Sequence, residues 1–177
     1  MRRSLLKCIL KLFFGRFYSQ PANRQKVTNR IVDYVLREGI SSEKLYDAIR
    51  RFVDVPSKSN LRRIRSLLGI RTNMLAVPLT FVAFLNPKKY PMIDNVVARW
   101  VNKNFVKHSR NRLVQLTKFN LASLRDNDFQ NYLNRVYWCR EMAEILTKEA
   151  RFKWRARDVE MAVFTAEREN LKLNVLT

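Results

Sequence analysis

The segment from Met74 to Leu85 constrains the fold of this chain more than any other stretch. Its apolar residues fall on nearly every side of a helix, and they are Met74, Leu75, Val77, Leu79, Phe81, Val82, Phe84 and Leu85. A helix without a polar face belongs in the middle of a core, because no side of it gains from contact with water. Pro78 comes early enough to be tolerated, and Asn86-Pro87 ends the segment. We therefore expect the other helices to pack around this one.

Amphipathic helices are predicted on both sides of it, since apolar residues recur at helical spacing. Before it, helices are expected over 24–38, from Ser41 or Ser42 onward, and from about 61 to Gly69, with Arg62, Arg63 and Arg65 facing outward. The residues expected to face inward in these helices are Val27, Ile31, Val35, Leu45, Ala48, Ile49, Phe52, Leu61, Ile64, Leu67 and Leu68.

After the apolar segment, three helix starts are predicted. Asp94 opens a helix, Asp126 or Asp128 caps a long one, and Asp158 is the expected N-cap of the last. The expected inward residues include Val97, Trp100, Val101, Phe129, Tyr132, Val136 and Tyr137. No stretch alternates with a period of two, so the fold class is all-α, a compact multi-helix domain.

The predicted organisation is a helical domain over residues 23–170, with a basic N-terminal segment at 1–22 and a tail at 171–177. Arg3, Lys7 and Lys11 share one helical face, and the charges interrupt the apolar run well below a membrane-spanning length. Two interpretations stay open for residues 1–20: a helix docked on the domain, or a membrane-surface or targeting segment. Membrane contact is expected only through these residues.

Charge points to a polyanionic partner. The chain of 177 residues carries 35 Lys and Arg against 15 Asp and Glu, which gives a net charge of +20. Such an excess on a chain rich in apolar residues favours nucleic acid, with double-stranded DNA as the first expectation and an anionic membrane as the alternative. We expect a monomer located inside the cell, in cytoplasm or nucleoid, with organelle targeting left open.

Cofactor and metal chemistry have little support. Cys8 and Cys139 are too few for a zinc or iron–sulfur site, and His108 has no second ligand nearby. With three glycines in the chain, no phosphate-binding loop of the NTPase or dinucleotide type is predicted. The expectation is no metal and no cofactor.

The order of elements over residues 61–101 resembles the core of the helix-hairpin-helix DNA glycosylase superfamily. The residues that carry this resemblance are Leu67-Leu68-Gly69-Ile70, the apolar segment, Pro91-Met92-Ile93-Asp94, and Val97-Ala98-Arg99. The resemblance implies a helix-hairpin-helix-like core and a base excision repair activity that hydrolyses the N-glycosidic bond of a damaged or mismatched base.

The same resemblance assigns roles to residues. Asp94 matches the essential carboxylate, and Gly69 and Ile70 match the hairpin whose backbone N–H groups approach a phosphate. Asp94 is then expected across the buried helix from the Gly69 hairpin. The candidate DNA-binding residues are Gly69, Ile70, Arg71, Arg62, Arg65, Lys88, Lys89, His108, Arg110 and Arg112, and the candidates for a base pocket are Tyr90 and Trp154.

Two positions depart from the family pattern. Arg71 stands where the second hairpin glycine is expected, and Asn73 stands where bifunctional members have a lysine. The hypotheses are therefore a monofunctional glycosylase that uses water, a glycosylase in which Lys88 or Lys89 substitutes for the missing lysine, or a non-catalytic nucleic-acid-binding protein on the same scaffold. A peripheral membrane protein is a further alternative.

Overall fold

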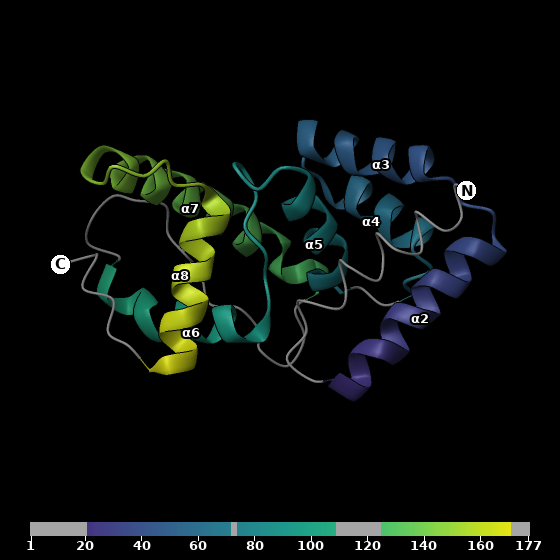
Figure 1. The fold of residues 1–177 in the computed structure, drawn as a ribbon, viewed down its shortest axis with the longest axis horizontal. Coiled ribbons are helices and arrows are strands. Elements are labelled where there is room, and N and C mark those ends of the chain that lie inside the picture. The colour runs from purple at the N-terminus through teal and green to yellow at the C-terminus, as the bar shows by residue number, and fades with distance from the viewer. Residues whose placement is uncertain (1–20, 72–73, 109–124, 171–177) are drawn as a thin grey trace. The chain divides into compact units, whose positions relative to one another are not determined.

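The computed structural model describes residues 21–71, 74–108 and 125–170, and side chains over 26–71, 74–103 and 125–170. Every regular element within these ranges is helical, apart from one isolated bridge between Met74 and Arg125, so the all-α prediction is confirmed. The elements are α2 (Pro21–Arg37), α3 (Ser42–Asp54), α4 (Lys58–Leu67), α5 (Ala76–Leu85), α6 (Asn95–His108), the 3-10 turn η1 (Asp126–Asp128), α7 (Phe129–Glu149) and α8 (Ala156–Glu169) (Figure 1).

The chain divides into two compact units, Met1–Thr72 and Asn73–Thr177. The boundary falls inside the segment 61–101 that resembles the glycosylase core. Each unit has its own buried residues, and each is described by itself below.

In the N-terminal unit, α3 and α4 pack on one another along apolar stripes (Figure 1). Ser41 caps α3, since its hydroxyl accepts a hydrogen bond from Lys44 N at 3.1 Å, and Ser57 caps α4 in the same way through Asn60 N. The buried residues of α3 and α4 include all those that the periodicity predicts: Leu45, Ala48, Ile49, Phe52, Leu61, Ile64 and Leu67.

Both α2 and α4 end in a glycine-containing Schellman cap. Gly39 and Gly69 have φ values of +60° and +66°, which lie in the left-handed region. In α4, Ile70 N donates to Arg65 O at 2.9 Å and Gly69 N donates to Ser66 O at 3.1 Å. The predicted stops at the two glycines are confirmed.

In the C-terminal unit, α5 is buried on every side, as the sequence predicts. The residues from Val77 to Ala83 are all buried, and Asn86 is the C-cap. The one buried polar side chain in this stretch, Thr80, is satisfied because its hydroxyl donates a hydrogen bond to Ala76 O at 2.8 Å. The middle of the helix with the lowest polarity is therefore buried, while Leu85 at its C-terminal end is exposed.

Helix α8 packs on both α6 and α7 (Figure 1). The inner face of α6 is Val97, Trp100 and Val101, as predicted. The predicted face of α7 is partly wrong: Tyr137 is 51% exposed, whereas Arg135 and Trp138 are buried. The face is rotated because Trp138 packs against Trp100, with ring centroids 5.8 Å apart, and so takes the inward position.

The predicted N-cap of α8 is also wrong. The helix begins at Ala156 with Arg155 as N-cap, so Asp158 lies in the first turn, where its carboxylate accepts a hydrogen bond from Arg155 N at 2.8 Å. This is the reciprocal half of a capping box, in which an acid in the first turn binds the N-cap backbone.

None of the helices in the described ranges has the length and the apolar character needed to cross a lipid bilayer.

Candidate functional site

Asp94 lies at the N-terminus of α6, where the sequence places it. Its Oδ1 accepts a hydrogen bond from Val97 N at 2.8 Å, and the side chain is half-buried. The residue is therefore the N-cap of α6 and satisfies one of the N–H groups that a helix start leaves without a partner.

The connection from α5 to α6 that carries Asp94 is held in place by α7 and α8. Tyr132 donates its hydroxyl hydrogen bond to Pro91 O at 3.0 Å, and Met92 N donates to Glu160 Oε2 at 3.2 Å. The first N–H groups of α8 also donate to this connection, Ala156 N to Lys88 O at 3.3 Å and Arg157 N to Pro87 O at 3.1 Å. We call residues 86–94 the bridge. Its polar backbone is fixed from two helices.

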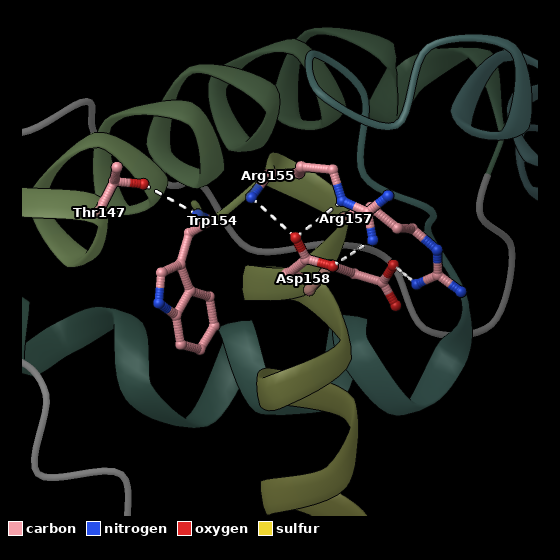
Figure 2. A network of polar contacts seen from close by, with 6 residues as sticks. Thr147, Trp154, Arg155, Arg157 and Asp158 are labelled. Atoms are coloured by element: carbon pink, nitrogen blue, oxygen red, sulfur yellow. Dashed lines mark hydrogen bonds and ion pairs between the residues drawn. The ribbon is translucent and has the colours of Figure 1, made fainter. Parts of the chain in front are cut away.

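Glu160 and Arg157 form a buried ion pair beside the bridge. The side chains are 4% and 12% exposed, and Figure 2 shows the place of Arg157. Burial lowers the pKa of Arg157 to about 10, and the nearby carboxylate of Asp94 is the largest of the opposing influences. Asp94 and Arg157 thus belong to one electrostatic cluster.

Arg135 on α7 is a second guanidinium in this region. It is fully buried, and none of its three side-chain nitrogens has a hydrogen-bond partner. Burial raises the pKa of the Cys139 thiol, and the neighbouring charge of Arg135, which acts to lower that pKa, does not offset it. A raised pKa is the opposite of what a reactive thiolate needs. Sequence reasoning missed Arg135 and Glu160, because both looked like solvated charges.

The Gly69 hairpin, in the N-terminal unit, uses its backbone N–H groups internally. Those of Gly69 and Ile70 donate to Ser66 O and Arg65 O, as described above. A Cβ on Gly69 would lie 2.6 Å from Cδ1 of Tyr34, so the aromatic ring covers the glycine closely. The position of this hairpin relative to Asp94, which is in the other unit, stays a prediction.

Helix α4 presents a continuous basic face. Lys58, Arg62 and Arg63 are exposed together with Ser59 and Ser66, and the helix contains no acid. These side chains fall on one arc of the helix, opposite its buried stripe. Arg71, which follows the hairpin, is also exposed.

Arg65 is not part of this face. The prediction that it points outward is wrong, because the residue is 4% exposed and lies among the buried side chains of α4. The spacing of Arg65 from Leu61 and Leu68 places it on the inner side of the helix, so direct contact with phosphate is not available to it in this conformation.

The bridge residues proposed for DNA contact differ in exposure. Lys88 is exposed, whereas Lys89 is half-buried with its ammonium group 5.3 Å from the ring centroid of Tyr90. Tyr90 itself is fully buried, so no face of its ring is open to a base.

Trp154 lies in the turn between α7 and α8 (Figure 2). Trp154 N donates to Thr147 Oγ1 at 2.9 Å, and Arg155 makes two side-chain hydrogen bonds to Asp158, of 2.8 and 2.7 Å. This contact with Arg155 lowers the pKa of Asp158. Phe152, which sequence reasoning did not single out, makes an edge contact with Trp154 at a centroid distance of 5.9 Å.

Arg110 and Arg112 lie outside the described residues, and His108 is the last residue of α6, with no described side chain. Within the described part of the chain, no three His, Cys, Asp or Glu side chains gather in a way that could hold a metal ion.

No protein-family model, no curated protein and no solved structure matches this chain.

Proposed function

We propose that the protein binds nucleic acid, with the basic face of α4 as a contact surface for the phosphate backbone. The observation that carries this proposal is the face itself: Lys58, Arg62 and Arg63 are exposed along one side of a helix without an acid. The net charge of +20 supports a polyanionic partner. Duplex DNA is the first ligand to test.

The chemistry of the face suits phosphate rather than base recognition. Guanidinium groups can bind phosphate oxygens through two hydrogen bonds, while the hydroxyls of Ser59 and Ser66 add neutral donors. Phosphate contacts fix the position of a protein on the duplex without reading its sequence. Binding through α4 alone is therefore expected to be salt-sensitive and weakly sequence-specific.

The test is the salt dependence of binding. The double substitution Arg62→Gln with Arg63→Gln should reduce the magnitude of the slope of log K against log[salt] by about 1 to 2, because each lost phosphate contact removes about 0.9. Fluorescence anisotropy with a labelled duplex measures this slope.

A matched control is available on the neighbouring helices. Arg37 and Arg50 are also highly exposed, and they lie on α2 and α3, outside the α4 face; Arg37 is 3.1 Å from Glu38 and Arg50 is 3.9 Å from Asp54. Substituting both with Gln should leave the slope within error of the unchanged protein. An equal loss of slope in the control would contradict a role for the α4 face.

A second candidate function is hydrolysis of an N-glycosidic bond, in the manner of helix-hairpin-helix glycosylases, with Asp94 as the essential carboxylate. The observation in its favour is a half-buried acid at the start of α6 beside Arg157. A fixed negative charge there would suit a sugar that becomes positive as its base leaves. The hydrogen bond from Val97 N to Asp94 Oδ1 favours binding without catalysis, because it gives the carboxylate a structural role as the N-cap of α6.

Two substitutions of Asp94 separate the functions. Asp94→Asn keeps a good N-cap and removes the charge, whereas Asp94→Ala also removes the cap and should cost about 1 kcal/mol of stability. We expect no base release from a panel of lesion-bearing duplexes by the unchanged protein, and DNA affinity in Asp94→Asn that is unchanged or slightly higher. Base release that disappears in Asp94→Asn would establish hydrolysis.

A further inference from the structure

We propose that the groove beside Phe152 and Trp154 seats an unpaired nucleobase, so that the protein holds single-stranded nucleic acid at this place. The proposal rests on the nucleic-acid binding proposed above and adds the class of ligand. It concerns the C-terminal unit, apart from the α4 face.

The sequence of the turn alternates cations and aromatic rings: Arg151-Phe152-Lys153-Trp154-Arg155. The rings of Phe152 and Trp154 make an edge contact, while Arg151, Lys153 and Arg155 are exposed. Proteins that hold single strands combine such cations, which follow the phosphates, with rings on which bases stack.

A groove lies beside the rings. Its volume is about 470 Å³, and its walls include Phe152, Trp154, Asp158, Met161, Ala162 and Thr165. Small-molecule sites in proteins have volumes of about 300 to 1,000 Å³, so a base fits. Phe152 and Met161 are 58% and 42% exposed, which leaves apolar surface open to a planar ligand.

The groove is shaped before any ligand arrives. Thr147 accepts a hydrogen bond from Trp154 N and donates its own to Ala143 O at 2.6 Å, so the turn is tied to α7. Asp158 holds Arg155 from the first turn of α8 (Figure 2). A site that is already ordered loses less entropy on binding, which favours affinity.

The polar edge of Trp154 is the second independent observation. Its indole Nε1 is buried and has no hydrogen-bond acceptor. Indole N–H groups usually find a partner when buried, and an unmet donor is costly. The carbonyl oxygens and ring nitrogens of a base are acceptors of the kind that this donor lacks.

A base explains these features better than an apolar peptide does. The exposed cations Arg151 and Lys153 complement a phosphate backbone, and the indole donor without an acceptor matches the acceptors of a base edge. A peptide segment that used the apolar walls alone would leave both without a partner.

The experiment compares two strands of equal charge. A labelled oligothymidylate of about 12 nucleotides and a strand of the same length with abasic central positions are titrated against the full chain by fluorescence anisotropy. We expect the base-bearing strand to bind roughly tenfold tighter. Phe152→Ala should abolish that preference and leave the salt dependence of binding unchanged.

The control is Tyr137→Ala, which removes another exposed aromatic residue of the same unit. This variant should keep the preference. Equal affinity of the unchanged protein for the two strands would overturn the proposal, as would equal losses in the two variants. Salt-dependent binding of duplex with no preference for bases in the single strand would leave the proposed function intact and remove this site alone, whereas no binding to any nucleic acid would remove both.

Discussion

Substituting Glu160 with alanine is expected to lower the free energy of unfolding by about 3 to 5 kcal/mol, the usual cost of removing one partner of a buried ion pair. The Arg157 guanidinium would remain in a place where 12% of its side chain reaches solvent, with its nearest carboxylate gone. Met92 N would lose its acceptor at the same time. Urea denaturation followed by circular dichroism measures the change, with the m-value as a check on two-state unfolding.

Glu167 on the same helix is the matched control. Its side chain is 9% exposed, but its partners Lys103 and Arg99 are 62% and 48% exposed and can return to water when the carboxylate is removed. Glu167→Ala should therefore cost about 1 kcal/mol or less. A similar cost in the two variants would show that the burial of Arg157 is not what matters.

The double variant Glu160→Ala with Arg157→Met tests the mechanism directly. Removing both charges of the pair means that no buried guanidinium is left without the Glu160 carboxylate, so we expect the double variant to be more stable than Glu160→Ala alone. Additive losses would mean that the two side chains do not act as a pair.

Substituting Gly69 with alanine is expected to cost about 2 to 5 kcal/mol. Left-handed backbone costs a residue with a Cβ about 1 to 2 kcal/mol. At Gly69 the added carbon would also meet the ring of Tyr34, with Cδ1 at 2.6 Å, and such overpacking typically adds about 1 to 3 kcal/mol. Thermal and urea unfolding of the variant give the value.

Gly39 supplies the control, since it has nearly the same φ and no atom within 4 Å of an added Cβ. Gly39→Ala should cost only the backbone part, about 1 to 2 kcal/mol. In a Tyr34→Ala background, the cost of Gly69→Ala should fall to that of Gly39→Ala. If Gly69→Ala costs no more than Gly39→Ala in the unchanged background, the Tyr34 ring moves aside, and its close approach to Gly69 does not contribute to the cost of the substitution.

The helices themselves were predictable because their signals are local. The buried stripes of α3 and α4 follow from helical spacing alone, and the ends at Gly39, Gly69 and Asn86 follow from backbone chemistry that each residue carries with it. Asp94 as the start of α6 is a prediction of the same kind, and the hydrogen bond from Val97 N confirms it.

What the sequence could not show is which charged residues lie inside. Arg65, Arg135 and Glu160 belong to residue types that are almost always solvated, yet all three are buried. The carboxylate of Glu160 accepts a hydrogen bond from Met92 N, 68 residues earlier in the chain, and helical periodicity does not predict contacts over such a separation. The misplaced face of α7 has the same origin, because Trp138 is drawn inward by Trp100 on another helix.

The groove beside Phe152 and Trp154 could be predicted from the sequence only in part. The alternation of cations and rings from Arg151 to Arg155 is visible in the sequence, and it names the chemistry of the turn. The groove also needs α8 to begin at Ala156, so that Asp158, Met161 and Thr165 face the two rings. The start of α8 at Ala156 is stabilised by the hydrogen bond from Arg155 N to Asp158, whereas the sequence prediction took Asp158 itself as the N-cap.

The hydrogen bonds that hold the bridge have a consequence for folding during synthesis. Lys88 O, Pro87 O and Met92 N all find their partners in residues 156–160. During synthesis, these three hydrogen bonds cannot form until residues 156–160 have been translated, although Tyr132 on α7 is made earlier and can already bind Pro91 O. Long-range contacts of this kind slow folding, because the chain between them must be ordered before they form. The bridge therefore takes its final place only after α8 has been made.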